Sequence, residues 1–294
     1  MNKDTEKALF HSFTICCGGR ILEFERPAVM GILNVTPDSF YDGGRHQTAS
    51  EYLDRAGEIV SEGADIIDIG AVSTRPGAKL LAPSDEALIL KRVVGDVRRE
   101  FPQAVISVDT CFSLPARTAV EAGADIVNDI SGGEFDVQMF PVVAELGVPY
   151  VLMHNKATPD RMQDNPQYDN ILEEVTLFLS KRVDTLRRLG VRDIIIDPGF
   201  GFAKTLEHNY QLFARLPELK SLFPNEPLLV AVSRKSMIYK LLGTTPDEAL
   251  TGTVALHAAA LLSGAQLLRV HDVREARETI SVIEKLSSIS QSQS

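Results

Sequence analysis

A pattern of amphipathic segments and short apolar runs recurs along the chain. In each unit an amphipathic segment ends near a glycine, and the apolar run that follows closes on a polar residue. Continuous apolar runs are typical of strands buried on both faces, and glycine suits the left-handed residue that ends a helix. The unit appears as EGADIIDIG (62–70), EAGADIVND (121–129), LGVPYVLMH (146–154), LGVRDIIID (189–197) and SGAQLLRVHD (263–272).

Three further apolar runs predict strands without the glycine, at Ala28–Val35, Ala104–Thr110 and Pro227–Ser233. Between the strands, apolar positions recur every three to four residues, which predicts helices. Examples are Ser50–Ser61, Asp85–Glu100, Asn170–Leu189 and Asp247–Leu262.

Eight buried strands that alternate with helices predict an α/β fold with a wholly parallel sheet. We expect a single-domain (β/α)₈ TIM barrel over residues 14–286, preceded by an N-terminal tail (1–13) and followed by a disordered C-terminal tail (287–294). An open doubly wound sheet is the alternative. It is disfavoured because no GxGxxG phosphate-binding turn follows the first strand.

Composition narrows the class of protein. The formal net charge of −10 argues against nucleic acid or an anionic membrane as the main partner. The longest apolar region, Val254–Val270, is interrupted by polar residues, and the N-terminus lacks the apolar core of a signal peptide. The three cysteines form neither a zinc spacing nor a disulfide framework. We therefore expect a cytoplasmic protein with no membrane span.

Polar side chains close every predicted strand. In a barrel these strand ends converge on one face, where active sites form. Asp109 and Asp197 follow buried runs, where an unpaired carboxylate is costly, and they suggest recognition of a donor-rich heterocycle rather than a metal cage. For some of the others a helix N-cap is an equally good interpretation. The closing residues are Asn34, Asp68, Asp109, Asn128, His154, Asp197, Ser233 and the Arg269–His271 pair, with capping an even alternative for Asp68, Asn128 and Ser233.

Four loop motifs add candidate chemistry: NVTPDSFYDGG (34–44), STRPG (73–77), SRKS (233–236) and RVHDV (269–273). The first carries oxygen ligands acceptable to Mg²⁺. The others supply cations in an acidic chain, and Arg269 and His271 lie two apart on one strand face, as expected for gripping an anion. The implied ligand has a planar polar ring and a phosphate or pyrophosphate.

These motifs, in this order, resemble the dihydropteroate synthase family from about Pro27 to Ile283. The resemblance implies a (β/α)₈ barrel, a homodimer and a reaction that needs Mg²⁺. The expected reaction joins 6-hydroxymethyl-7,8-dihydropterin pyrophosphate to 4-aminobenzoate in folate biosynthesis and releases pyrophosphate. Both substrates are small molecules, and sulfonamide drugs target the family.

The resemblance also implies residue roles. Asp109, Lys235, Arg269 and His271 would be the catalytic set, and Asn34 would contact Mg²⁺. Asp109, Asn128, Met153, Asp197 and Lys235 would bind the pterin. Arg269 would stack on the ring and, with His271, Asn34, Thr74 and Arg75, hold the pyrophosphate. The aminobenzoate would be surrounded by Phe40, Pro76, Phe202 and Ser236.

The chain departs from the family pattern at three places: Gly70-Ala71-Val72, Asn155-Lys156-Ala157-Thr158-Pro159 and Ala203. Two competing functions stay open on the sequence. One is a methyltetrahydrofolate–corrinoid methyltransferase, which would share the pterin carboxylates but has no need of the anion-binding motifs. The other is a non-catalytic pterin-binding protein that retains the barrel.

Overall fold

A computed structural model describes residues 12–35, 49–71, 81–156 and 166–291. Its centre is an eight-stranded parallel sheet in the order β8-β7-β6-β5-β4-β3-β10-β9. The strands are β3 (Ala28–Asn34), β4 (Ile66–Gly70), β5 (Val105–Asp109), β6 (Ile126–Asp129), β7 (Tyr150–Met153), β8 (Ile194–Asp197), β9 (Leu229–Val230) and β10 (Leu267–Val270).

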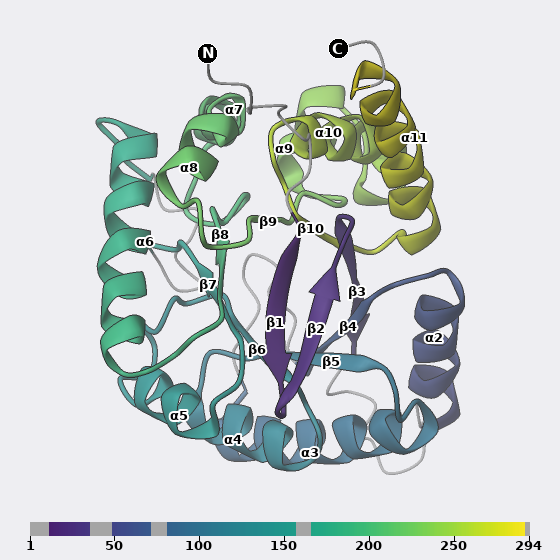
Figure 1. The fold of residues 1–294 in the computed structure, drawn as a ribbon, viewed down its shortest axis with the longest axis vertical. Helices are drawn as coiled ribbons and strands as arrows, with labels where there is room; N and C mark the ends of the chain where they lie inside the picture. The colour runs from purple at the N-terminus through teal and green to yellow at the C-terminus, as the bar shows by residue number, and fades with distance from the viewer. Residues whose placement is uncertain (1–11, 36–48, 72–80, 157–165, 292–294) are drawn as a thin grey trace.

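The sheet closes into a barrel through a parallel bridge between Ile196 of β8 and Leu228, the residue before β9. Each strand except the last is followed by a segment that returns over the outside of the barrel, and the helices surround the strands (Figure 1). The predicted (β/α)₈ barrel is therefore confirmed, and the open doubly wound sheet is excluded.

The outer layer consists of helices that bury one apolar face against the strands. Val93 and Val97 on α3, like Leu179 on α6, are fully buried in this outer core. All five glycines predicted to follow helices have positive φ, as a left-handed terminating residue requires. The helices are α2 (Ala49–Ser61), α3 (Pro83–Glu100), α4 (Ser113–Glu121), α5 (Met139–Leu146), α6 (Ile171–Arg188), α7 (Leu206–Ala214), α8 (Leu216–Leu222), α9 (Ser236–Leu242), α10 (Leu250–Leu262) and α11 (Val273–Gln291), with a 3₁₀ helix at Pro246–Glu248.

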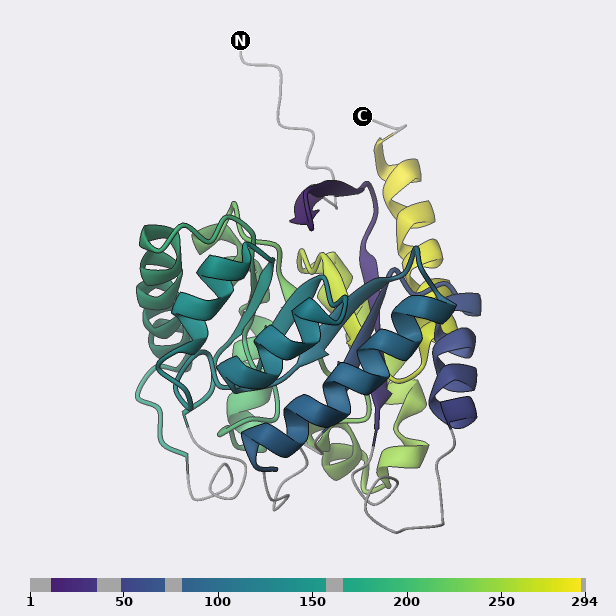
Figure 2. The same cartoon turned by 90° about the horizontal axis from the view of Figure 1, so that it is seen from below.

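The barrel interior has an apolar lower layer. One inward side chain from each strand contributes to it: Met30, Ile66, Val105, Ile126, Val151, Ile195, Leu229 and Leu267. An antiparallel hairpin of β1 (Phe13–Cys17) and β2 (Arg20–Phe24) inserts Phe13, Ile15 and Cys17 into the same cluster. The hairpin crosses one end of the barrel in Figures 1 and 2 and closes it, while the carboxyl ends of the strands lie at the opposite end.

The structure differs from the sequence prediction at three elements. The hairpin was not predicted, because it lies outside the repeating pattern. The strand predicted at Pro227–Ser233 is shorter in the structure. Only Leu229–Val230 forms a regular strand, which pairs with Leu267 and Leu268 of β10. Helix α11 continues to Gln291, into the segment 287–294 that was expected to be disordered. Within this helical end the hydroxyls of Ser287 and Ser288 donate to Ile283 O and Lys285 O.

Across the described ranges, no helix is both long and apolar enough to cross a membrane. The domain limits of 14–286 remain a prediction.

Candidate active site

Strand alternation puts a polar layer directly above the apolar one. Asp68 lies two residues after the inward Ile66, and the same spacing relates Asn128 to Ile126, Asp197 to Ile195 and Arg269 to Leu267. Because successive strand residues face opposite sides, these side chains point into the barrel. The residues between them, such as Ile67, Val127 and Ile196, pack outward against helices. The predicted convergence of strand-end polar residues is thus present in the fold.

Arg269 links two carboxylates across the barrel. Its Nε donates to Asp68 Oδ2 and its Nη2 to Asp109 Oδ2, each at 2.6 Å. Asn128 Nδ2 donates to the same Asp68 oxygen at 3.1 Å. The Arg269 side chain is only 14% exposed, and the two carboxylates are almost wholly buried. Three strands are therefore joined by one guanidinium, which keeps three of its five N–H groups for other partners.

Asp197 and Lys235 make up the opposite side of the polar layer. Asp197 Oδ1 accepts the backbone N–H of Gly199 at 2.7 Å. Lys235 Nζ donates to Phe200 O at 2.6 Å and lies 4.7 Å from the centre of the Phe202 ring. The stem of Lys235 runs past Gly201, where a Cβ would come within 3.2 Å of it. Glycine at this position leaves room for the lysine to reach the site.

An apolar patch lies beside these polar groups. Cys111, Ile130, Met153 and Phe202 form one buried cluster, with Phe135 packed against it. The structure therefore brings Met153 and Phe202 together, although the sequence prediction placed them around different substrates. A planar ring bound over this patch would have apolar contacts on one face and carboxylates at its edge.

His271, Ser236 and Asn34 lie farther out. The backbone N–H of His271 donates to Ser233 Oγ at 3.2 Å, and its carbonyl accepts from Arg55 Nη2 at 2.9 Å. Ser236 begins helix α9. Asn34 ends β3 with its side chain exposed. Four predicted site residues, Phe40, Thr74, Arg75 and Pro76, lie outside the described residues.

Burial shifts the pKa values of the site. It raises the pKa of Asp109 to about 7, although the Arg269 cation opposes the shift. It also raises the pKa of Asp197, against the pull of Lys235, and lowers the pKa of Lys235 to about 8, against the attraction of Asp197. For Arg269, burial lowers the pKa, but the Asp68 and Asp109 carboxylates more than compensate, so it stays a cation.

Sequence reasoning missed two groups. For Asp68 the sequence left helix capping and a role in the site as equal interpretations. In the structure Asp68 is fully buried and anchors Arg269 together with Asp109. Its alternation with Ile66 was the available signal. Lys204 was given no role from the sequence, yet this residue is only 3% exposed. Nothing local in the sequence shows that a lysine beside two glycine–phenylalanine pairs is buried.

Gly70 lies close to two side-chain oxygens. A Cβ built there would meet Asn34 Oδ1 at 3.4 Å and Asp109 Oδ2 at 3.9 Å, so glycine keeps a gap between two oxygen donors. Within the described part of the chain, no three His, Cys, Asp or Glu side chains are grouped to hold a metal. Asn34 Oδ1 and Asp109 Oδ2 would fit Mg²⁺, which commonly binds one or two protein oxygens together with substrate phosphates and water.

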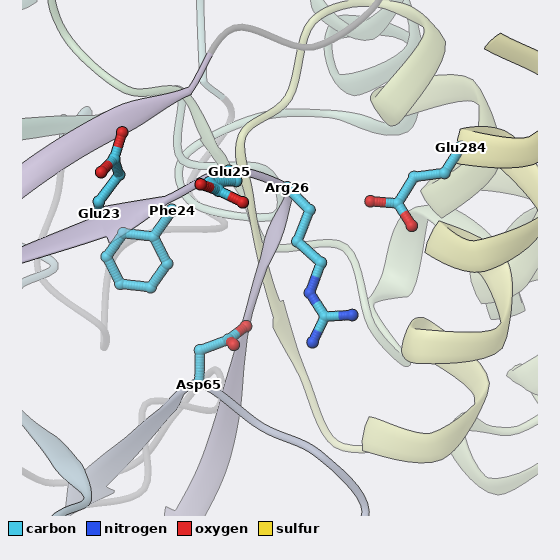
Figure 3. A pocket seen from close by; sticks show the side chains of 6 residues that line it. All are labelled: Glu23, Phe24, Glu25, Arg26, Asp65 and Glu284. Carbon is cyan, nitrogen blue, oxygen red and sulfur yellow. The ribbon is translucent and has the colours of Figure 1, made fainter. Parts of the chain in front are cut away.

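A hollow lies at the closed end of the barrel, far from the strand carboxyl ends. Figure 3 shows Arg26 pointing between Asp65 and Glu284, with Phe24 beside them. Its remaining lining residues are the exposed Glu23 and Glu25. The hollow shares no residue with the polar layer, so the candidate site is the one at the strand carboxyl ends.

Fold and site together are those of a barrel enzyme whose buried polar layer can bind a planar, hydrogen-bonding ring. The model of the family "Pterin binding enzyme" matches residues 30–271. Dihydropteroate synthase of Escherichia coli K12 is 41% identical over 268 residues, covering 90% of this chain and 94% of that protein. The enzyme of Synechocystis is 43% identical over 265 residues, covering 89% and 91%.

Solved structures agree. Yersinia pestis dihydropteroate synthase in complex with a sulfonamide drug superposes with a TM-score of 0.86 at 39% identity, covering 94% of this chain and all of that one. The Xanthomonas albilineans enzyme with 4-aminobenzoic acid gives 0.85 at 39% identity, covering 94% and 98%. The chain belongs to the dihydropteroate synthase family of pterin-binding enzymes. The predicted transferase activity in folate biosynthesis is confirmed over the methyltransferase and the non-catalytic binder.

Proposed function

We propose that the chain condenses 6-hydroxymethyl-7,8-dihydropterin pyrophosphate with 4-aminobenzoate at the polar layer, giving 7,8-dihydropteroate and pyrophosphate. The observation that carries this is the convergence of three aspartates, one asparagine and two cations above an apolar barrel floor. Relatives support the substrates: the Xanthomonas albilineans structure contains 4-aminobenzoic acid, and the Yersinia pestis structure a sulfonamide drug. Sulfonamides should accordingly bind this chain in place of 4-aminobenzoate.

The pterin would bind over Met153, with Asp109, Asn128 and Asp197 meeting its ring N–H groups. Carboxylate and amide oxygens accept from such donors, and burial strengthens each bond. Lys235 supplies the donor that complements the pterin carbonyl or ring nitrogen. A pocket with an apolar face and polar edges both places the ring and discriminates against rings that lack the donors.

The departing diphosphate would lie near Arg269, His271 and Asn34, joined by Thr74 and Arg75. Three N–H groups of Arg269 are not used by Asp68 and Asp109, so the guanidinium can contact an anion without losing its anchors. Mg²⁺ held by Asn34 and the diphosphate would supply charge neutralisation on the leaving group. The Asp109 carboxylate, once ionised, faces the pterin and can stabilise positive charge that develops on the ring as the C–O bond weakens.

The amine of 4-aminobenzoate is the nucleophile, so no covalent enzyme intermediate is needed. Its ring would be surrounded by Phe40, Pro76, Phe202 and Ser236, of which the structure describes Phe202 and Ser236. Phe202 is 8% exposed and lies in the apolar cluster with Met153, which supports a position where the two substrate rings meet.

We also propose a homodimer. Val282 and Leu286, one turn apart on α11, are 61% and 55% exposed, and such side chains on one helix face are common at subunit contacts. Light scattering at several protein concentrations would measure the mass, and a monomer at micromolar concentration would contradict this proposal.

Release of pyrophosphate on mixing both substrates with Mg²⁺ tests the function. We expect release only when the pterin pyrophosphate, 4-aminobenzoate and Mg²⁺ are all present. Methyl transfer from methyltetrahydrofolate to a corrinoid, or pterin binding without turnover, would contradict the proposal.

A further inference from the structure

Lys204 is a buried lysine whose amino group has three partners. Its Nζ lies 2.8 Å from Gly199 O, 3.1 Å from Phe202 O and 3.0 Å from His154 Nδ1. An ammonium can donate to all three. A neutral amine can donate to the two carbonyls and accept from a protonated His154 Nδ1, so each protonation state uses every contact. The amino group therefore ties two points of the loop 198–203 to the end of strand β7.

The loop that Lys204 holds has an unfavourable backbone. Gly199, Gly201 and Ala203 have φ values of 72°, 83° and 45°. The two glycines adopt this region freely, but an alanine does not, because its Cβ crowds the following carbonyl. At Gly199 a Cβ would come within 2.0 Å of His154 O, so the loop passes directly against the β7 end. Such a conformation persists only where surrounding contacts hold it.

The same loop carries contacts that the site uses. Gly199 N–H holds Asp197 Oδ1 and Phe200 O receives Lys235 Nζ, while the Phe202 ring lies beside that lysine. The backbone of Asp197 is fixed by β8, where His154 N–H donates to its carbonyl at 2.9 Å. The orientation of its carboxylate and the position of Lys235, by contrast, depend on a loop outside the sheet.

We propose that Lys204 is a positioning residue of the active site: its three contacts hold the loop 198–203 in the form that orients Asp197, Lys235 and Phe202 toward the pterin. This inference rests on the proposed function for the identity of the ligand. Lys204 itself touches no reacting atom, so its loss should weaken binding rather than abolish turnover.

Lys204→Met keeps an unbranched side chain that is one atom shorter and removes the three polar contacts. We expect KM for the pterin pyrophosphate to rise about tenfold while kcat stays within about threefold of wild type. A purely structural role would lower kcat at constant KM, because fewer molecules would be folded. Lys220→Met is the matched control. Lys220 Nζ also has three partners, the carbonyls of Phe223, Pro224 and Glu226, but they lie at the closed end of the barrel. The KM of Lys220→Met should therefore equal that of wild type.

Hydrogen exchange of the substrate-free protein tests, without any reaction, whether Lys204 holds the loop 198–203. Amides of residues 199–204 should exchange faster in Lys204→Met than in wild type and Lys220→Met. His154→Phe fills a similar space and removes one partner of the amino group, so it should give a smaller change of the same kind, with KM raised about threefold. If Lys204→Met does not fold, the exchange rates and KM of His154→Phe test the proposal instead.

Unchanged exchange and unchanged KM in both Lys204→Met and His154→Phe would overturn the proposal. Failure of the wild-type protein to bind 6-hydroxymethyl pterin in a calorimetric titration would instead reject the proposed function. The exchange rates would still decide whether Lys204 holds the loop, since they need no substrate.

Discussion

Arg269 connects the chemistry of the site to its architecture. It is buried between Asp68 and Asp109, and a buried cation of this kind is stable only where carboxylates compensate it. The two bonds also fix the plane of the guanidinium, so the N–H groups left over have set directions. The residue is both an anchor of three strands and the proposed contact for the diphosphate.

Replacing Asp68 with asparagine should disturb this arrangement while keeping the volume of the side chain. The bond from Arg269 Nε loses its charge assistance, and hydrogen bonds to charged groups are typically worth about 1.5–3 kcal/mol. We expect affinity for pyrophosphate to fall about tenfold or more, since the guanidinium is then held less firmly on one side. Calorimetry against pyrophosphate with Mg²⁺ measures it. Asp65→Asn, which disrupts the Asp65–Arg277 pair at the closed end, is the control and should bind normally.

Asp197→Asn tests pterin recognition. The asparagine oxygen can still accept from Gly199 N–H, so the fold should be retained and the melting temperature should be close to that of wild type. Loss of the charge should weaken binding of 6-hydroxymethyl pterin by about 2 kcal/mol, roughly thirtyfold. A titration with unaltered affinity would show that Asp197 does not contact the pterin.

The ends of the strands supply the side chains from which the site is built. Each strand of the barrel gives a lower inward position to the apolar floor, and β4, β6, β8 and β10 give the next inward position to the polar layer. The ends of β3, β4 and β5 lie side by side, because Asn34 pairs in register with Gly70, and Gly70 with Asp109. A glycine in the middle strand therefore leaves a gap between the side chains on both sides.

Gly70→Ala should close that gap. The added methyl would make ordinary contacts of 3.4–3.9 Å, so the variant should fold. We expect the Mg²⁺-dependent part of pyrophosphate binding to fall at least tenfold, while binding of Mg²⁺-free hydroxymethyl pterin changes little. Gly95→Ala is the control: nothing lies within 4 Å of a Cβ in the middle of α3, so it should add stability of about 0.5–1 kcal/mol and leave binding unaltered. Equal pyrophosphate affinity in Gly70→Ala and wild type would place the metal elsewhere.

At the scale of the whole molecule, the closed barrel shifts the pKa values of the charged groups in the site. The apolar floor, the hairpin and the outer helices exclude water from the base of the site, and this burial shifts the pKa values of Asp109 and Lys235 toward each other. The two groups consequently titrate near neutral pH, where neither does in water.

The pH dependence of kcat/KM for the pterin pyrophosphate should be bell-shaped. The active form needs Asp109 ionised and Lys235 protonated. Activity should therefore rise as the pH passes about 7 and fall as it passes about 8. In Lys235→Arg the cation persists at high pH, so the residual activity should lose its alkaline limb and keep the acid one. A flat profile from pH 5 to 9 would contradict the assignment, since roughly tenfold loss is expected one unit beyond either pKa.

Local sequence patterns account for the repeating strand and helix units and for most of the polar layer. Alternation along a strand decides which side chains face inward, so the pattern alone puts Asp109, Asn128, Asp197 and Arg269 at the strand ends. Which of them pair depends on the tertiary fold. Arg269 meets Asp68 and Asp109 over separations of 201 and 160 residues, a contact that exists only because β10 pairs with β3 in the sheet. The burial of Lys204 likewise depends on the end of β7 meeting a loop fifty residues later, which no local pattern encodes.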